Sequence, residues 1–203
     1  KGFANISVPS VLATLVSDKL DFPNLSMVGV DDRAAAYQAV SYLIQQGHRK
    51  IAVLGGPATS YPSMMRRQGA QQAMEDAGIR FEDKLYGLSN YDFESAYHAM
   101  NGLLARRAEF TALFAMSDVI AFGAIRALVS AGLRVPEDVS VIGFDGITMS
   151  RYCVPVMTTI VQPSEQIALQ SIELLVRQIE HGTPAQTVTL QPELQQGESV
   201  RAI

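Results

Sequence analysis

Residues 112–145 read ALFAMSDVIAFGAIRALVSAGLRVPEDVSVIGFD and contain a strand, a helix and a second strand in succession. The apolar runs at 111–115 and 139–143 do not alternate with polar residues, which is typical of strands covered on both faces. Between them, residues 118–131 form a helical pattern that starts at an N-cap residue type and stops at Gly132. This order predicts a strand-helix-strand unit with two parallel strands.

The same alternation of strand and helix patterns extends over almost the whole chain. Further strands are expected at 8–15, 27–30, 50–54 and 158–161. Further helices are expected at 34–46, 63–77, from Asp92 or Ser95 to 107, and at Ser164–His181, while 191–203 should hold one short strand. The sequence therefore predicts an α/β fold with a Rossmann-like parallel sheet, right-handed crossovers and helices on both faces.

Composition excludes several classes of protein. The 203 residues include 16 Lys and Arg against 20 Asp and Glu, and the net charge of −4 argues against binding nucleic acid by charge alone. A hydrophobic share of 48% indicates a folded chain. The single cysteine, Cys153, has no partner for an internal disulfide, which suits a reducing compartment. The most apolar stretch, 119–125, is too short to cross a membrane.

Ligands of such sheets bind beyond the carboxyl ends of the strands, so the loops there hold the candidate site residues. The loop after residue 54 contains two glycines, Pro57, Ser60 and Tyr61, and leads into a helix that carries Arg66. It either binds a polar or anionic group or is a turn followed by two solvated arginines. It lacks the spacing of a dinucleotide-binding motif or a P-loop.

Polar residues also follow the next two strands. Ser117 and Asp118 open a helix, where they serve either as an N-cap or as partners of a ligand hydroxyl. Asp145 either accepts hydrogen bonds from adjacent sugar hydroxyls or caps its own turn. Tyr91, with Phe93 as a near alternative, lies before a helix and either stacks on a ligand or packs in the core.

No catalytic or metal-binding constellation is recognised in the sequence. The three histidines are scattered, Cys153 has no evident histidine partner, and no zinc-protease, serine-hydrolase or cysteine-cluster motif occurs. We therefore expect no enzymatic activity, no cofactor and no metal.

Several strings together carry a resemblance to a known family. They are VDDRAAAYQAVSYLIQQGHRKIAVLGGP at 30–57, RRQGAQQAMEDAGI at 66–79, VPEDVSVIGFD at 135–145 and PVMTTIVQP at 155–163. Over about residues 27–200, the chain resembles the effector-binding domain of bacterial LacI/GalR (lactose-repressor) transcriptional regulators. The resemblance implies a type I periplasmic-binding-protein-like fold, in which two Rossmann-like lobes hold the effector between them.

The resemblance also implies how the chain is divided. Residues 1–30 would be a remnant of the N-terminal lobe, 31–161 the C-terminal effector-binding lobe, 162–185 a return to the first lobe and 186–203 the end of the second. The N-terminal lobe is then incomplete and the DNA-binding helix-turn-helix is absent from this chain, so we expect a fragment. The apolar face of Ser164–His181 should be exposed or covered by another copy.

Residue by residue, the resemblance selects Arg66, three residues before Gly69, as the arginine that clamps the effector. The fork-shaped cation suits vicinal hydroxyls or a carboxylate. The resemblance selects Asp145 as the aspartate after Gly-Phe, with Gly146 where a second aspartate is frequent in the family. It also selects Gln162, near a crossover between the lobes.

Other positions match the family less closely. Ser117 stands where the family often has an asparagine, so the paired donor and acceptor of an amide are lost beside Asp118. Tyr91 or Phe93 matches an aromatic residue of the family. Around the loop after Pro57 the family is variable, which weakens the assignment of two further candidates, Ser60 and Tyr61.

The predicted function is effector sensing in a cytoplasmic, DNA-binding repressor or activator. A small effector, such as a sugar, sugar phosphate or nucleoside, would modulate operator binding by an N-terminal helix-turn-helix in a homodimer, with no membrane partner. The alternative is a periplasmic sugar-binding protein of the same fold, which a signal peptide upstream would indicate. An α/β enzyme is a third hypothesis, and no catalytic constellation supports it.

Overall fold

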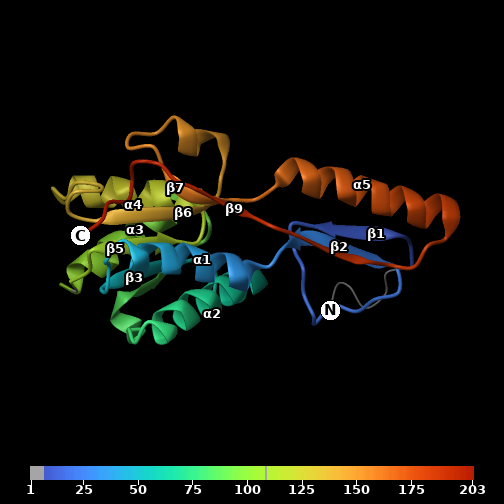
Figure 1. The fold of residues 1–203 in the computed structure, drawn as a ribbon, viewed down its shortest axis with the longest axis horizontal. Helices are drawn as coiled ribbons and strands as arrows, with labels where there is room; N and C mark the ends of the chain where they lie inside the picture. Colours follow the sequence, from blue (N-terminus) through green and yellow to red (C-terminus); the bar gives the residue numbers. More distant parts are fainter. Residues whose placement is uncertain (1–6, 108) are drawn as a thin grey trace. The chain divides into compact units, whose positions relative to one another are not determined.

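The computed structural model describes residues 7–107 and 109–203 and divides the chain into two compact units. Unit 1 contains the chain up to Asp31 and the segment Gln162–Pro192, and unit 2 contains Asp32–Val161 and Glu193–Ile203. Each unit has its own sheet with helical cover (Figure 1). The chain therefore passes from one unit to the other three times.

Unit 2 is built on a six-stranded sheet. Its strands are β3 Ile51–Gly55, β4 Tyr86–Leu88, β5 Ala112–Ala115, β6 Ser140–Asp145, β7 Thr158–Val161 and β9 Glu193–Gln195. They lie in the order β4-β3-β5-β6-β7-β9, and all are parallel except β9, which runs antiparallel to β7. The helices are α1 Asp32–Gln45, α2 Tyr61–Asp76, α3 Phe93–Ala105 and α4 Asp118–Ser130, with short 3₁₀ turns η1 Asp83–Leu85 and η2 Thr148–Arg151.

The helices of unit 2 pack in two pairs, α1 with α2 and α3 with α4 (Figure 1). Glycines at the two contacts allow the helices to approach closely. A Cβ added at Gly69 would lie 2.0 Å from the carbonyl oxygen of Arg33, and one added at Gly123 would lie 2.5 Å from the carbonyl oxygen of Phe93. No larger residue fits at either position without moving a helix.

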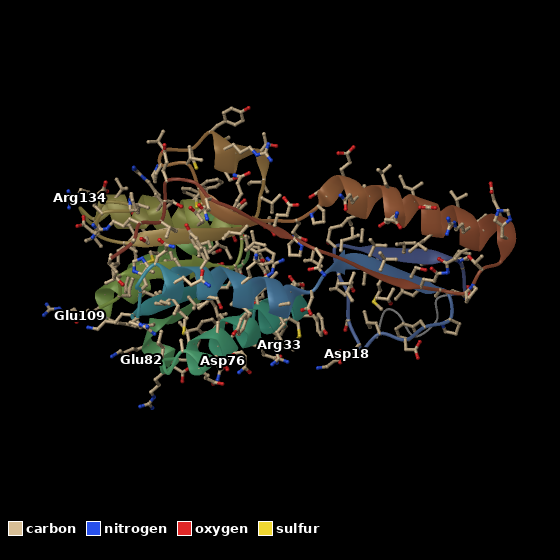
Figure 2. All side chains as sticks on the ribbon, in the orientation of Figure 1. Asp18, Arg33, Asp76, Glu82, Glu109 and Arg134 are labelled. Atoms are coloured by element: carbon tan, nitrogen blue, oxygen red, sulfur yellow. The ribbon has the colours of Figure 1, made fainter. Side chains whose placement is uncertain are left out.

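The core of unit 2 lies on both sides of the sheet. Every residue of β3 and β5 is buried, which explains why their apolar runs do not alternate with polar residues. Most charge lies outside this core, as the labelled side chains of Asp76, Glu109 and Arg134 illustrate (Figure 2). In the part of the chain that the structure describes, no helix is long and apolar enough to span a membrane.

The order of the strands reverses beside β3. From β3 the chain runs through α2 to β4 at the edge of the sheet, and α3 then leads it back to β5 on the other side of β3. The loops after β3 and β5 thus lead away in opposite directions, and such switch points open a crevice at the carboxyl edge of a parallel sheet. This topology places the start of α2 and the start of α4 on either side of that edge.

Unit 1 has a parallel sheet of β1 Ser10–Ala13, β2 Leu25–Val30 and β8 Thr187–Leu190, with β2 in the middle. The helix α5, Ser164–His181, packs on this sheet. Its Ile167 and Leu174 are buried against Val28, whereas Ile172 and Ile179 are more than half exposed. The apolar face of this helix was expected to be exposed. This expectation is confirmed for Ile172 and Ile179, and it is wrong for Ile167, which is buried.

The strands and helices expected up to residue 181 are confirmed to within two residues at each end, and Ser164–His181 is confirmed at both ends. Within 191–203, the expected short strand is confined to β9, Glu193–Gln195. The elements β4, β8, η1 and η2 lie outside the expected ones. Each has only three or four residues, and so short a segment carries too little periodicity to be recognised.

The division of the chain differs from the expected one near the C-terminus. The expectation assigns 186–203 to the second lobe, whereas the structure keeps residues up to Pro192 in unit 1. The reason is that β8 pairs with β2 in unit 1 before β9 joins the edge of the unit 2 sheet beside β7.

Candidate ligand-binding site

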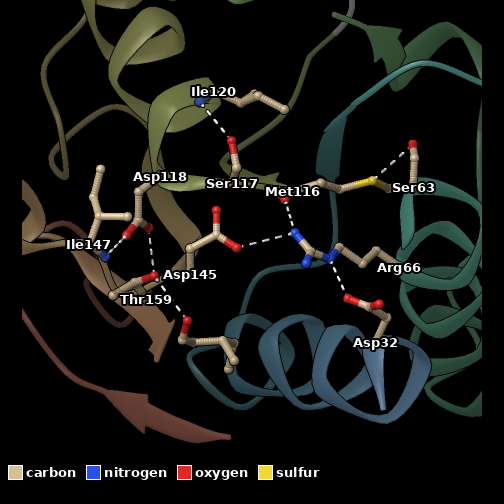
Figure 3. A network of polar contacts seen from close by, with 11 residues as sticks. Asp32, Ser63, Arg66, Met116, Ser117, Asp118, Ile120, Asp145, Ile147 and Thr159 are labelled. Carbon is tan, nitrogen blue, oxygen red and sulfur yellow. Dashed lines mark hydrogen bonds and ion pairs between the residues drawn. The ribbon is translucent and has the colours of Figure 1, made fainter. Parts of the chain in front are cut away.

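Arg66 lies in the second turn of α2 at the centre of a buried polar network (Figure 3). Its Nε–H donates to Oδ1 of Asp32 at 2.7 Å, and its Nη1 donates to the carbonyl oxygen of Met116. Nη1 also lies 3.5 Å from Oδ1 of Asp145. The guanidinium carbon is 3.6 Å from the ring centroid of Phe144, so a π face covers the cation. The hypothesis of a solvated arginine is therefore wrong for Arg66, whose side chain is 6% exposed.

Asp32 is a network residue that sequence reasoning missed. It is the first residue of α1, 34 positions before Arg66, and its side chain is almost fully buried. An acidic residue at a helix N-terminus is common because it complements the helix dipole, so nothing local marks it as a partner of an arginine. The only signal is its place inside the string VDDRAAA, which contributes to the family resemblance.

Asp145 is the last residue of β6, and its side chain is 28% exposed, far more than that of Arg66. Its φ is +108°, in the left-handed region that residues other than glycine rarely adopt, and Gly146 follows with a φ of +70°. A Cβ at Gly146 would lie 2.7 Å from the Cα of Val161, so only glycine fits this turn. The turn points the Asp145 carboxylate toward Arg66 (Figure 3).

Asp118, the first residue of α4, is fully buried and faces the protein. Its Oδ2 accepts the N–H of Ile147 at 2.8 Å, and its Oδ1 accepts the hydroxyl of Thr159 at 2.6 Å (Figure 3). Burial, with a contribution from the charge of Asp145, raises the pKa of the Asp118 carboxyl to about 6. Asp118 thus ties the loop after Asp145 to β7.

Ser117 caps α4. Its Oγ accepts the N–H of Ile120 at 3.1 Å, and its side chain is buried, which is the N-cap role left open by the sequence. The preceding residue, Met116, turns its carbonyl oxygen toward Arg66. The strand end therefore contributes a backbone oxygen to the network, while the Ser117 hydroxyl is engaged by its own helix.

Tyr91 lies against the loop after β3. Its φ is +61°, and a Cβ added at Gly56 would lie 2.1 Å from its Cε2, so the ring covers Gly56. The carbonyl oxygen of Gly56 accepts from Oγ of Ser63 at 3.1 Å, and this Oγ is 3.8 Å from Sδ of Met116, next to Arg66. The Tyr91 hydroxyl oxygen is buried and has no hydrogen-bond partner within 7–107 and 109–203, which makes it a candidate partner for a ligand.

The structure thus brings four of the predicted site residues together, namely Arg66, Ser117, Asp118 and Asp145, and Tyr91 adjoins them. The others are placed at element ends. Ser60 and Tyr61 lie at the start of α2, and Phe93 is the half-exposed first residue of α3. Gln162 belongs to unit 1.

Comparison with known proteins identifies the family to which the chain belongs. The model of the periplasmic binding protein-like domain matches residues 40–200. The HTH-type transcriptional regulator MalR of Clostridium butyricum is 37% identical over 198 residues, which are 97% of this chain and 59% of MalR. The chain is a periplasmic-binding-protein-like domain of the LacI/GalR family. The resemblance inferred from the sequence strings is confirmed.

The LacI/GalR domain is also similar to the HTH-type transcriptional repressor CytR of Escherichia coli K12, with 37% identity over 172 residues. These are 85% of this chain and 50% of CytR, so the chain spans about half the length of such relatives. A solved structure described as a complex of the transcriptional regulator CelR with cellobiose has a TM-score of 0.84 and 33% identity, over 90% of this chain and 56% of that one. Because these relatives are transcriptional regulators, the regulator interpretation is favoured over a periplasmic binding protein.

Proposed function

We propose that this LacI/GalR domain binds a small, sugar-like effector at the edge formed by Arg66 and Asp145. One observation carries the proposal: a buried arginine and a partly exposed carboxylate lie together at the carboxyl edge of the unit 2 sheet, next to the switch point between β3 and β5. Ligands of parallel α/β sheets bind at such points. The complex of the similar regulator CelR with cellobiose supports a sugar as the ligand class.

The chemistry of the edge fits a polyol. A carboxylate such as that of Asp145 accepts hydrogen bonds from two adjacent hydroxyl groups, while the guanidinium of Arg66 donates to them. Asp32 and Met116 already hold Arg66, so little side-chain freedom is lost when a ligand arrives. The Tyr91 hydroxyl, which is buried without a hydrogen-bond partner within 7–107 and 109–203, would supply a further polar contact.

The effector regulates DNA binding by favouring one conformation of the intact protein. It shifts the population only as far as its affinities for the two conformations differ. The proposed protein is a cytoplasmic homodimer with an N-terminal helix-turn-helix. There, the difference in effector binding free energy between the two conformations changes the affinity for an operator. The HTH-type relatives support this role, and the exposed apolar side chains of Met149, Tyr152 and Val154 around η2 support self-association.

Operator binding by the complete gene product tests the proposal. Fluorescence anisotropy of a labelled operator fragment is measured with and without each member of a panel of sugars, sugar phosphates and nucleosides. Asp145→Ala should keep operator binding and lose the response to the active ligand. Asp83→Ala removes an exposed carboxylate paired with Arg67 and should respond like the wild type.

Two results would refute the proposal. One is that no ligand changes operator binding, and the other is that Asp145→Ala responds as the wild type does. A signal peptide encoded upstream, with no operator binding at all, would instead indicate an exported sugar-binding protein.

A further inference from the structure

We propose that Asp118 is a positioning residue for the effector, which it does not touch: its ionised carboxylate holds the turn after β6 and so directs the Asp145 side chain toward the ligand. The inference rests on the proposed function and concerns the regulation of the same edge. The sequence left two roles open for Asp118, an N-cap or a partner of a ligand hydroxyl. The contacts of its carboxylate exclude both.

Asp118 is closed off from any ligand. It is fully buried, and both of its carboxylate oxygens accept hydrogen bonds within the protein (Figure 3). Oδ2 accepts the backbone N–H of Ile147 at 2.8 Å, and Oδ1 accepts the hydroxyl of Thr159 at 2.6 Å. The N-cap of α4 is Ser117, and Asp118 binds groups outside its own helix. Its carboxylate therefore acts on the turn and not on the ligand.

Strand β6 makes room for this carboxylate. A Cβ added at Gly143 would overlap Oδ1 of Asp118 and would lie 3.3 Å from Oγ1 of Thr159. A glycine inside a strand often marks a place where another group approaches the backbone closely. Gly143 lies two residues before Asp145, so the carboxylate packs against the strand whose end carries the effector contact.

The turn needs an anchor because its backbone is strained. Asp145 and Gly146 have φ values of +108° and +70°, and a positive φ is costly for a residue other than glycine. Before the turn, Asp145 is paired with Val161 of β7. After it, the N–H of Ile147 is held by Asp118. Such strain persists only where the surroundings fix the chain on both sides, and Asp118 supplies the second side.

Loss of this anchor lowers effector affinity through the population of the turn. Where the strained conformation is not held, the turn relaxes, and only a fraction of the molecules keeps Asp145 in the direction that binds. The apparent affinity falls by that fraction. An ionised carboxylate is a stronger acceptor than a neutral carboxyl or an amide, so a proton on Asp118 weakens the hold without removing it.

The surroundings of Asp118 set the pH at which this happens. Burial is the main cause that raises the pKa of its carboxyl to about 6, and the charge of Asp145 on β6 adds to it, while hydrogen bonds from β7 and from the turn oppose it. The thiol of Cys153, after η2, is also near this charge and stays neutral, because burial raises its pKa. Arg66 of α2 contacts Asp145 instead. Effector affinity should therefore fall as the pH drops through about 6.

The first test needs no ligand. The three-bond HN–Hα and one-bond Cα–Hα couplings of Asp145, which report φ, are measured by NMR in the whole chain at about pH 8, where Asp118 is ionised. The positive φ should persist in the wild type and in Asp118→Asn, which keeps an acceptor, and should be lost or averaged in Asp118→Ala. Asp138→Ala is the matched control, because Asp138 also accepts a backbone N–H, that of Arg134, in another loop of unit 2. It should leave the couplings of Asp145 unchanged, and unchanged couplings in Asp118→Ala would overturn the inference.

The second test uses the member of the sugar, sugar phosphate and nucleoside panel that changes operator binding. Its affinity for the complete gene product is measured by calorimetry in the wild type and in Asp118→Asn. At about pH 8 the variant should bind about threefold to fivefold more weakly. At about pH 5 the two should bind equally, because the wild type is then protonated as well.

Two outcomes of the second test would overturn the inference. One is a ratio of affinities that does not change with pH. The other is complete loss of binding in Asp118→Asn, since the carboxylate would then contact the ligand itself. If no member of the panel acts, the proposed function fails, while the couplings of Asp145 still decide whether Asp118 positions it.

Discussion

Nε of Arg66 donates to Oδ1 of Asp32 across 2.7 Å, and both side chains are more than nine-tenths buried. The pair joins the start of α1 to the second turn of α2. Each charge, taken alone out of water, would cost several kcal/mol, so each depends on the other for its place in the fold. Arg66 therefore reaches the edge beside Asp145 in a fixed position and with its charge compensated.

Removal of Asp32 should destabilise the chain. We expect Asp32→Ala to lower the free energy of unfolding by about 3 kcal/mol, because it leaves a buried guanidinium with an incomplete set of partners. Adding Arg66→Met to the same chain should recover much of the loss, because no unpaired charge then remains. Urea denaturation measures both. If the free energy of unfolding of Asp32→Ala alone lay within about 0.5 kcal/mol of the wild-type value, the pair would not be important for stability.

Asp145 should show a strained backbone. At a φ of +108°, glycine is tolerated and alanine is not, so Asp145→Gly should be more stable than Asp145→Ala by about 1 kcal/mol. Both variants remove the carboxylate and should lose the effector response equally. Chemical denaturation of the two side by side gives the difference, and equal stabilities would show that position 145 carries no strain.

Asp118 should make stability depend on pH. Burial raises its carboxyl pKa from 3.8 to about 6, so the folded state binds the proton more readily than the unfolded state. Its contribution to stability is therefore full below about pH 4 and is lost as the pH rises through about 6. Relative to Asp118→Asn, the wild type should lose about 2 kcal/mol over this range. Urea denaturation at a series of pH values checks this, and parallel curves for the two proteins would disprove it.

Thr159 should hold the pKa of Asp118 down. Its hydroxyl donates to Oδ1 of Asp118 at 2.6 Å and stabilises the ionised form. Thr159→Val removes the donor and keeps the shape, so the Asp118 pKa should rise further above its wild-type value. The ¹³C shift of the Asp118 carboxyl carbon, titrated in both proteins, measures it. An unchanged or lower pKa in the variant would rule out this hydrogen bond.

The close contact of α1 and α2 should require glycine at position 69. A Cβ there would lie 2.0 Å from the carbonyl oxygen of Arg33, so Gly69→Ala should push the helices apart and cost about 1–3 kcal/mol. Gly102 in α3 is the matched control, since a Cβ there meets nothing within 4 Å. Gly102→Ala should stabilise the chain by up to about 1 kcal/mol, because alanine favours the helix. Thermal denaturation should show shifts of opposite sign, and shifts of the same sign would contradict the close contact.

The fold class could be predicted from the sequence because its signals are local. Helix α5 begins and ends where the pattern places it, and its C-cap Gly182 adopts a φ of +61°. Strand β5 is apolar without alternation because helices cover both faces of its sheet. Such signals act within a turn of helix or a few residues of strand, so they survive in a single sequence. Strand β4 has only three residues, which is too short a segment to show such a local signal in the sequence.

The sequence by itself determined the parallel α/β fold, the family resemblance, and the presence of Arg66 in the helix after β3 and of Asp145 at the end of β6. Only the tertiary structure decided how these residues are used. Asp32 compensates Arg66 from 34 positions away, and Thr159 engages Asp118 from 41 positions away. Both pairings follow from the order of the strands and from the packing of α1 on α2. Charge compensation depends on distances of a few ångströms in space, and no local pattern encodes which distant residue will lie there.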